Sequence, residues 1–307
     1  MNIYYNPDLK QIHIRPSQIS QDEMEKKSIF KNQPTICEQG KKFIANDKTN
    51  LYELMVSHSD ICPNRAFRKR CLENNVDPVP ISVRNTNLAV CSLIFDKDDN
   101  LLLTRRQARL HFFPKAWVAA GGGVELGEQL EIACLRELEE ETGIKIDAIP
   151  FKQKLDEPIK YNNFHYQYQN EPVIEFYPYY AFESASYKDN VSYAPARSTH
   201  LIMFYVLKIN KHKDEIGLRL QYTEVDYGAW LSKEDTLDLL AHKTKDEIIQ
   251  GFKPKDRSGE VVPCEINKKQ VMQLYTIEKG EGIGKAHFMA LDYYFNIHLT
   301  EKQQVIE

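Results

Sequence analysis

The sequence predicts an α+β fold in which a mixed sheet lies between helices, an α/β/α sandwich that carries N-terminal and C-terminal extensions. Two apolar runs indicate buried strands, residues 88–95 (LAVCSLIF) and 201–209 (LIMFYVLKI), and the second is expected to be central and covered on both faces. Between them, residues 128–142 give about four helical turns without glycine or proline, and Gly143 is expected to end this helix as its cap.

The remaining elements follow from turn signals and hydrophobic patterning. Residues 96–100 form a polar turn, so residues 101–105 are expected to return as the second strand of a hairpin. A later helix is expected to begin at Ser232, because Asp235 follows three residues on, as in a capping box. Short strands at 117–119, 144–151, 174–182 and 224–231 and a last helix at 284–295 complete the prediction.

The length of the chain allows one large domain with extensions or two small domains, and the order of the predicted elements favours the first. The chain has 307 residues, of which 42% are hydrophobic, enough for a packed core. Residues 1–85 show no recognisable chemistry and are interpreted as an N-terminal extension. Residues 86–245 are the predicted domain, and residues 246–307 are the predicted C-terminal extension. Both extensions are candidate contact regions for protein partners.

Charge and cysteine content narrow the classes of function. A formal net charge of −4 argues against a dedicated nucleic-acid binder, and six cysteines without a CxxC pair are typical of free thiols in a reducing compartment. No run approaches the roughly 18 apolar residues that a membrane span needs. A cytoplasmic location is therefore expected. The alternative is mitochondrial, because the first 21 residues hold one acid, Asp8, against Lys10 and Arg15.

Three glutamates share one face of the predicted helix. At about 100° per residue, Glu137, Glu140 and Glu141 fall within a sector of roughly 100°, which is expected to face a cleft. Clustered carboxylates repel one another unless a cation lies among them, and Mg²⁺ prefers such oxygen ligands. Arg136 is expected to offset part of the repulsion and to orient a neighbouring glutamate. The residues expected on the core-facing side are Ile132, Leu135 and Leu138.

Glycines precede the acidic helix at positions 121–123. Without side chains they permit a tight turn and the close approach of a ligand. Alone they indicate only a turn, and the glutamates alone could be a solvated acidic face. Together they predict a loop that approaches a phosphate, facing a helix that bears a metal.

The run from Gly122 to Ile144 (GGVELGEQLEIACLRELEEETGI) satisfies Gly-x5-Glu-x7-Arg-Glu-U-x-Glu-Glu-x-Gly-U, with U aliphatic, at every specified position. In this it resembles the Nudix hydrolases, most of all the group named nucleoside diphosphate-linked moiety X motif seventeen. The similarity extends over about residues 86–297. It implies a Nudix-type sandwich and a Mg²⁺-dependent hydrolase, with Mn²⁺ as a substitute, that cleaves the diphosphate of a nucleoside diphosphate linked to another group. The implied substrates are dinucleotides, capped RNA or coenzyme-like molecules.

The resemblance assigns the metal to Glu137, Glu140 and Glu141, with Glu128 and Arg136 organising the helix or assisting catalysis. One of these carboxylates is the expected general base, and Glu183 and Glu224 from later segments are alternatives. The residues expected to bind substrate are Gly121, Gly122, Arg105 and Lys115, with Arg106 as a further candidate for phosphate contact.

Two departures from the family pattern bear on the substrate. Nudix chains commonly carry a proline just before the double glycine, where this chain has Ala119 and Ala120. The pattern of coenzyme A-specific members is incomplete, because His111 and Lys115 stand where it has an arginine and a glycine. Coenzyme A is therefore not favoured. The rival interpretation is a Nudix fold used as an accessory subunit of a larger assembly.

Overall fold

The computed structural model describes residues 71–75, 86–125, 128–150, 164–186, 198–243, 246–276 and 280–298, together with five strands near the N-terminus. Those strands form an antiparallel sheet in the order β2-β1-β5-β3, with β4 also paired to β5. Their bounds are β1 (Asn2–Asn6), β2 (Gln11–Arg15), β3 (Cys37–Gly40), β4 (Ala45–Asn46) and β5 (Leu51–His58).

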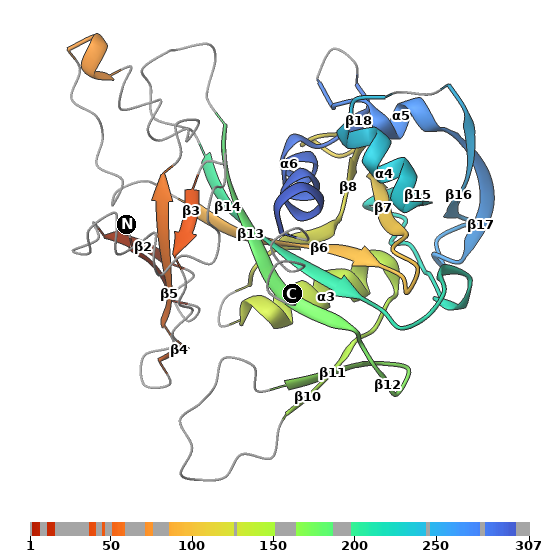
Figure 1. Cartoon of the computed structure of the whole chain (residues 1–307), viewed down its shortest axis with the longest axis horizontal. Coiled ribbons are helices and arrows are strands. Elements are labelled where there is room, and N and C mark those ends of the chain that lie inside the picture. The colour runs from red at the N-terminus through yellow and green to blue at the C-terminus, as the bar shows by residue number, and fades with distance from the viewer. Residues whose placement is uncertain are drawn as a thin grey trace.

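A ten-stranded mixed sheet forms the centre of the fold (Figure 1). Strand β14 pairs in parallel with β6 and antiparallel with β13, so the sheet mixes both kinds of pairing, as predicted. In order across the sheet, the strands are β13 (Glu175–Ser186), β14 (Ser198–Lys208), β6 (Thr86–Phe95), β7 (Leu101–Arg106), β15 (Val225–Leu231), β16 (Ile248–Pro254) and β17 (Val261–Asn267).

Three short strands and a separate small sheet complete the β structure. Strand β9 pairs with β6, and β8 pairs with β7 and with β18. The small sheet has the order β10-β11-β12. The bounds are β8 (Ala116–Val118), β9 (Ala120–Gly123), β18 (Gly282–Ile283), β10 (Asp147–Pro150), β11 (Phe164–Tyr168) and β12 (Glu171–Pro172).

Helices cover both faces of the main sheet. They are α3 (Leu130–Thr142), α4 (Lys233–Leu240), α5 (Lys268–Met272) and α6 (Lys285–Tyr293), with a 3₁₀ turn at Lys213–Glu215 and a π-helical turn at Tyr294–His298. Figure 1 shows α3 and α6 on opposite sides of β6. No helix in the described part of the chain has the length and apolar character needed to span a membrane.

Adjacent side chains of β14 show how aromatic residues pack on the two faces of the main sheet. Phe204 meets the ring of His287 on α6 edge-on, with centroids 5.3 Å apart. Its neighbour Tyr205 points to the other face and stacks on Phe176 at 5.4 Å, and Phe176 in turn contacts Tyr166 of β11. Because aromatic side chains bury large areas, these contacts join the sheet to its covering elements on both sides.

The predicted α/β/α sandwich with a mixed sheet is confirmed, and so are the main strands. Strand β14 lies inside the sheet between β13 and β6, as expected of an apolar run buried on both faces. The hydroxyl of Ser232 accepts the Asp235 amide at 3.0 Å and caps α4. The expected strand at 144–151 is shorter and lies in the small sheet. Strands β16 and β17 continue the main sheet, while the predicted boundary at residue 245 stays a prediction.

Helix α3 is rotated about its axis relative to the prediction. It begins at Leu130, two residues later than expected, and ends at Gly143, whose φ of 72° suits a glycine cap. Leu135 and Leu138 are buried as predicted, but Ile132 is 36% exposed, so its expected place in the core is wrong. Ala133 and Cys134 are buried instead. Their small side chains let the helix lie close to β6, where the Ser92 and Cys134 side chains are 2.8 Å apart.

A pair of substitutions on α3 tests this packing face. Leu135→Ala removes a side chain that is 7% exposed, so we expect a loss of about 2–5 kcal/mol in the free energy of unfolding. Ile132→Ala removes a more exposed side chain and is expected to cost under about 1 kcal/mol. Denaturant titrations of both variants measure the difference. Equal losses would show that α3 has another orientation.

Candidate active site

Strand β9 brings the three glycines directly against α3. Residues 89–92 of β6 pair antiparallel with β9, so the glycines form an extended strand and not the expected tight turn. This correction has a geometric cause, because strands β6 and β7 diverge here and β8–β9 fills the space between them. A Cβ on Gly122 would lie 2.4 Å from the Glu137 carboxylate, and a Cβ on Gly121 would lie 2.1 Å from the Val90 carbonyl oxygen. The glycines therefore allow close approach of this chain's own groups.

Arg136 connects the acidic residues of α3. Its Nε and Nη2 donate to the two carboxylate oxygens of Glu128 at 2.7 and 3.0 Å, a bidentate contact. Its Nη1 donates to Glu137 at 2.8 Å and to Glu140 at 3.3 Å, and Nη2 also reaches the Gly123 carbonyl at 2.9 Å. The carboxylates of Glu128 and, after it, Glu137 raise the pKa of Arg136. Arg136 thus fixes the acidic face to the glycine strand.

Glu141 is the buried member of the acidic face and is only 3% exposed. The Gly121 amide donates to its Oε2 at 3.2 Å. Burial raises the pKa of Glu141 to about 8, and the negative charge of Glu137 adds to the increase, whereas the Gly121 amide and Arg106 lower it. The expectation that all three glutamates face a cleft is wrong for Glu141, because the rotation of α3 carries this residue toward β9.

The donor set of this face fits a hard divalent cation. Burial raises the pKa values of both Glu137 and Glu141, because too little water and positive charge surround each carboxylate to stabilise its ionised form. A cation between them would supply that charge, and carboxylate oxygens are the ligands that Mg²⁺ prefers. The Glu140 side chain is 49% exposed, which leaves one side of the face open to water and phosphate. The assignment of the three glutamates as metal ligands stays a prediction.

The two arginines at the end of β7 have different surroundings. Arg105 donates to Asp226 at 2.7 and 2.9 Å and to Glu281 at 2.6 Å, with its guanidinium 4.1 Å from the Tyr227 ring centre. These contacts favour a structural role over the predicted contact with substrate, which stays untested. Arg106, on the other face of the strand, lowers the pKa of Glu141 and is therefore the arginine beside the acidic face.

Other predicted residues lie at the edge of the site. Lys115 is exposed, in a left-handed conformation at the end of the loop that follows β7. Glu224 raises the pKa of both Glu137 and Glu141, so its carboxylate is close enough to interact with the acidic face. The side chain of Glu183 lies outside the described residues. The proximity of Glu224 to the acidic face therefore supports it as a candidate general base.

Sequence reasoning missed the groups that hold the peptide between Val118 and Ala119. The Thr104 hydroxyl donates to the Val118 carbonyl at 3.3 Å, and the Ala119 amide donates to Nδ1 of His287 at 3.1 Å. Burial lowers the pKa of His287 to about 3, so the ring is neutral and Nδ1 can accept. This histidine lies 168 residues from Ala119, and no local signal links the two. A proline at position 119 could not make this bond.

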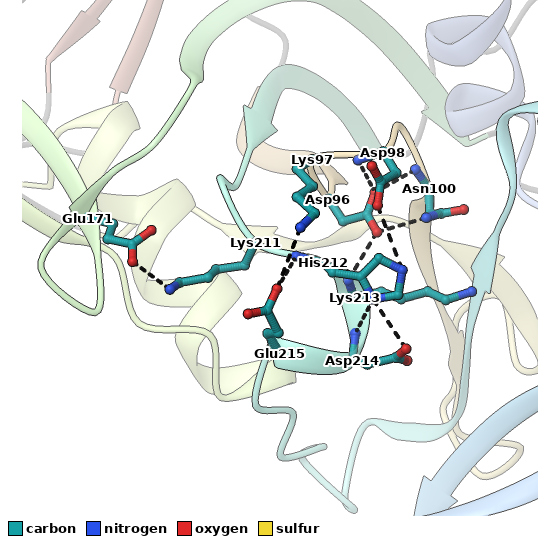
Figure 2. Close-up of polar contacts among 10 residues, drawn as sticks. All are labelled: Asp96, Lys97, Asp98, Asn100, Glu171, Lys211, His212, Lys213, Asp214 and Glu215. Atoms are coloured by element: carbon teal, nitrogen blue, oxygen red, sulfur yellow. Dashed lines mark hydrogen bonds and ion pairs between the residues drawn. The ribbon is translucent and has the colours of Figure 1, made fainter.

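A second acidic cluster lies at the opposite end of β6 (Figure 2). Ligand atoms of Asp96, Asp98 and His212 lie within 4.8 Å of one another, which in the described part of the chain is not true of the three glutamates. The Asp96 carboxylate, however, accepts four hydrogen bonds, from the amides of Asp98, Asn100 and Lys213 and from the Asn100 side chain, at 2.7–3.0 Å. These bonds satisfy the hydrogen-bonding capacity of the Asp96 carboxylate. They join the turn that contains Asp98 and Asn100 to the turn that contains Lys213.

Comparison with known proteins places the acidic helix and its sheet in a family. A NUDIX domain model matches residues 85–252, more than half of the chain. A Xenopus laevis protein named m7GpppN-mRNA hydrolase NUDT17 is 46% identical over 72 residues, 24% of each chain. The Homo sapiens protein of the same name is 26% identical over 187 residues, which cover 60% of this chain and 49% of that one. The chain thus spans about half or less of the length of these relatives.

Among solved structures, the NUDIX domain of Shewanella oneidensis NrtR complexed with ADP ribose aligns with 54% of this chain and 86% of its own. Its TM-score is 0.33 and its sequence identity is 18%. The family assignment rests on the family model, whose match runs from the start of β6 into β16 and includes the whole of α3. The chain belongs to the NUDIX domain family.

Proposed function

We propose that the chain is a Mg²⁺-dependent hydrolase that cleaves the diphosphate of a nucleoside diphosphate linked to another group. One observation carries the proposal. Glu137 and Glu141 are held against a glycine strand, with pKa values raised by burial, next to the exposed Glu140. Such a face is costly without a cation, and beside a bound cation it suits the phosphates of a substrate.

The residues of this chain would prepare the site for hydrolysis. Arg136 contacts Glu137 and Glu140, and the Gly121 amide holds Glu141, and these three carboxylates are the proposed metal ligands. A bound Mg²⁺ supplies charge neutralisation at the phosphoryl oxygens and lowers the pKa of a coordinated water. Glu224 is the proposed general base, since it interacts with this face from a separate segment.

Capped RNA is the first substrate to test, because the Xenopus laevis and Homo sapiens relatives carry the name m7GpppN-mRNA hydrolase. It is a proposal here, since this chain spans about half or less of those proteins. Dinucleotides, ADP-ribose and NADH share the diphosphate and follow in order. Coenzyme A is last, because of His111 and Lys115 in its sequence pattern.

The test is a hydrolysis screen of the purified full chain. With Mg²⁺ we expect release of a nucleotide product from at least one of these substrates, and we expect a chelator to abolish that release. Mn²⁺ is expected to restore it. The general base is tested separately, because Glu224→Gln should lower kcat by at least about 100-fold with little change in substrate binding.

The rival role, an accessory subunit without catalysis, predicts the opposite pattern. Such a subunit would hydrolyse none of the substrates and would associate stably with partners even when Glu140 and Glu141 are both replaced by glutamine. That combined result would overturn the proposed function.

A further inference from the structure

The loop after β7 lies beside the acidic face. This aromatic loop, residues 107–115 (QARLHFFPK), connects β7 and β8. The Gln107 amide donates to the Glu224 carbonyl at 2.7 Å, and its side chain donates to the Tyr222 carbonyl at 2.9 Å. The segment that it contacts is itself joined to the acidic helix, because the Gln221 amide donates to the Glu141 carbonyl at 3.1 Å. The loop is therefore connected to the acidic helix by hydrogen bonds through one intervening segment, residues 221–224.

Arg106 gives the aromatic loop a second point of attachment. Its Nε donates to the Phe112 carbonyl in the middle of the aromatic loop at 3.2 Å. The Lys115 amide donates to the Arg106 carbonyl at 3.1 Å, so the end of the loop is held at this residue as well. Arg106 therefore anchors the loop at the end of β7, next to the Gln107 contact with Glu224. A substrate whose diphosphate lies at the glutamates would have its adjoining nucleoside within reach of the loop.

The loop presents two aromatic rings to solvent. Phe112 is 68% exposed and Phe113 is 59% exposed, although side chains of this kind are usually buried. Phe113 has a φ of 49°, which is unfavourable for a bulky residue. Tyr275 supports the Phe113 ring edge-on at 6.0 Å, and His111 supports the Phe112 ring at 4.8 Å. Each ring thus has an aromatic neighbour and remains more than half exposed.

The charged residues near these rings indicate which class of ligand would bind there. Residues 106–115 contain three cations, Arg106, Arg109 and Lys115, and no carboxylate. Arg109 lies over the Tyr222 ring at 5.8 Å and stiffens the base of the loop. Aromatic faces next to cations match a ligand that carries a planar ring next to negative charge. A nucleotide has both.

We propose that Phe112 and Phe113 form a stacking platform for the nucleobase of the substrate, with Lys115 and Arg106 meeting the phosphates that follow it. This inference rests on the proposed function, because it places the phosphates at the acidic face. It assigns base recognition to a loop outside the glutamate motif. Stacking accepts any base, so the platform would give affinity for nucleotides as a class.

The experiment measures binding and turnover in the full chain. Phe112→Ala and Phe113→Ala should each weaken the binding of a nucleoside diphosphate by about tenfold, while binding of inorganic pyrophosphate, which has no base, stays unchanged. Phe112→Trp should retain nucleotide binding, and Phe112→Leu, which is apolar without a π face, should lose it. Ile248→Ala on β16 removes another exposed apolar side chain, 58% exposed, and serves as the control. In turnover assays KM should rise with little change in kcat.

Several outcomes would overturn the platform. One is equal loss of nucleotide and pyrophosphate binding, which would indicate a damaged site. Another is nucleotide binding by Phe112→Leu equal to that of the unchanged chain. A third is unchanged nucleotide binding together with loss of self-association or of a protein partner, which would make the patch a protein contact. Failure of the proposed function is distinguishable, because a chain that hydrolyses nothing can still show base-dependent binding through Phe112.

Discussion

Turnover is expected to fall at least about 100-fold when Glu141 is replaced by glutamine, and the chain is expected to stay folded. Glutamine has the size of glutamate, and its amide oxygen can still accept the Gly121 N–H, now at 3.2 Å from Oε2. It lacks the negative charge with which a carboxylate holds a divalent cation. Since burial disfavours that charge at position 141, its removal should not lower the free energy of unfolding. Glu140→Gln is expected to have a similar effect on turnover.

Glu139 provides a matched control on the same helix. Its side chain is 50% exposed and lies 4.0 Å from Lys145, away from Arg136. Glu139→Gln makes the same chemical change without touching the acidic face, so turnover should stay within about twofold. Steady-state kinetics and Mg²⁺ titrations of the three variants separate the outcomes. Full activity of the Glu140→Gln, Glu141→Gln double variant, or activity in a chelator, would refute the metal assignment.

The parts of the fold that the sequence predicted depend on local pattern. Helix α3 was predictable because its residues avoid glycine and proline up to Gly143, and strands β6 and β14 because their apolar runs are too continuous for an exposed strand. The direction in which a helix faces depends on what packs against it. Ile132 and Glu141 were both misplaced for this one reason, since β6 and β9 contact the side of α3 that carries Ala133 and Cys134.

Site residues that depend on distant partners could not be predicted. Arg105 and Arg106 are equivalent in the sequence, yet strand alternation sends one to Asp226 and the other toward Glu141. Asp226, which holds Arg105, lies 121 positions further along the chain. His287 is a stronger case, because its bond to the Ala119 amide depends on how α6 packs on the sheet. Nothing in the sequence around either residue shows that contact.

Alanine at each of the three consecutive glycines is expected to give three different results. All three have backbone conformations that alanine can adopt, since none has a positive φ. The differences therefore come from what a new Cβ would meet. At Gly121 it would lie 2.1 Å from the Val90 carbonyl oxygen and 2.7 Å from the Cys91 Cα. Backbone atoms cannot move aside without separating β9 from β6, so Gly121→Ala should cost at least about 3 kcal/mol of stability.

At Gly122 the obstacle is a side chain, and the expected loss is in activity. The new Cβ would lie 2.4–2.6 Å from the three carboxylate atoms of Glu137. That carboxylate can swing away, at the expense of its 2.8 Å contact with Arg136, so the fold should lose under about 1.5 kcal/mol. A displaced Glu137 would no longer face the metal position, and a misplacement of this size is expected to lower kcat about 100-fold.

Gly123 is the control for both substitutions, because a Cβ there would meet nothing within 4 Å. Gly123→Ala should leave stability and turnover nearly unchanged. Denaturant titrations give the free energy of unfolding of each variant, and assays with Mg²⁺ give its turnover. If the three positions lost activity in proportion to stability, the strand would matter only for folding. A fully active Gly122→Ala would mean that Glu137 does not need its place beside the strand, and Glu137 would then be removed from the predicted metal ligands.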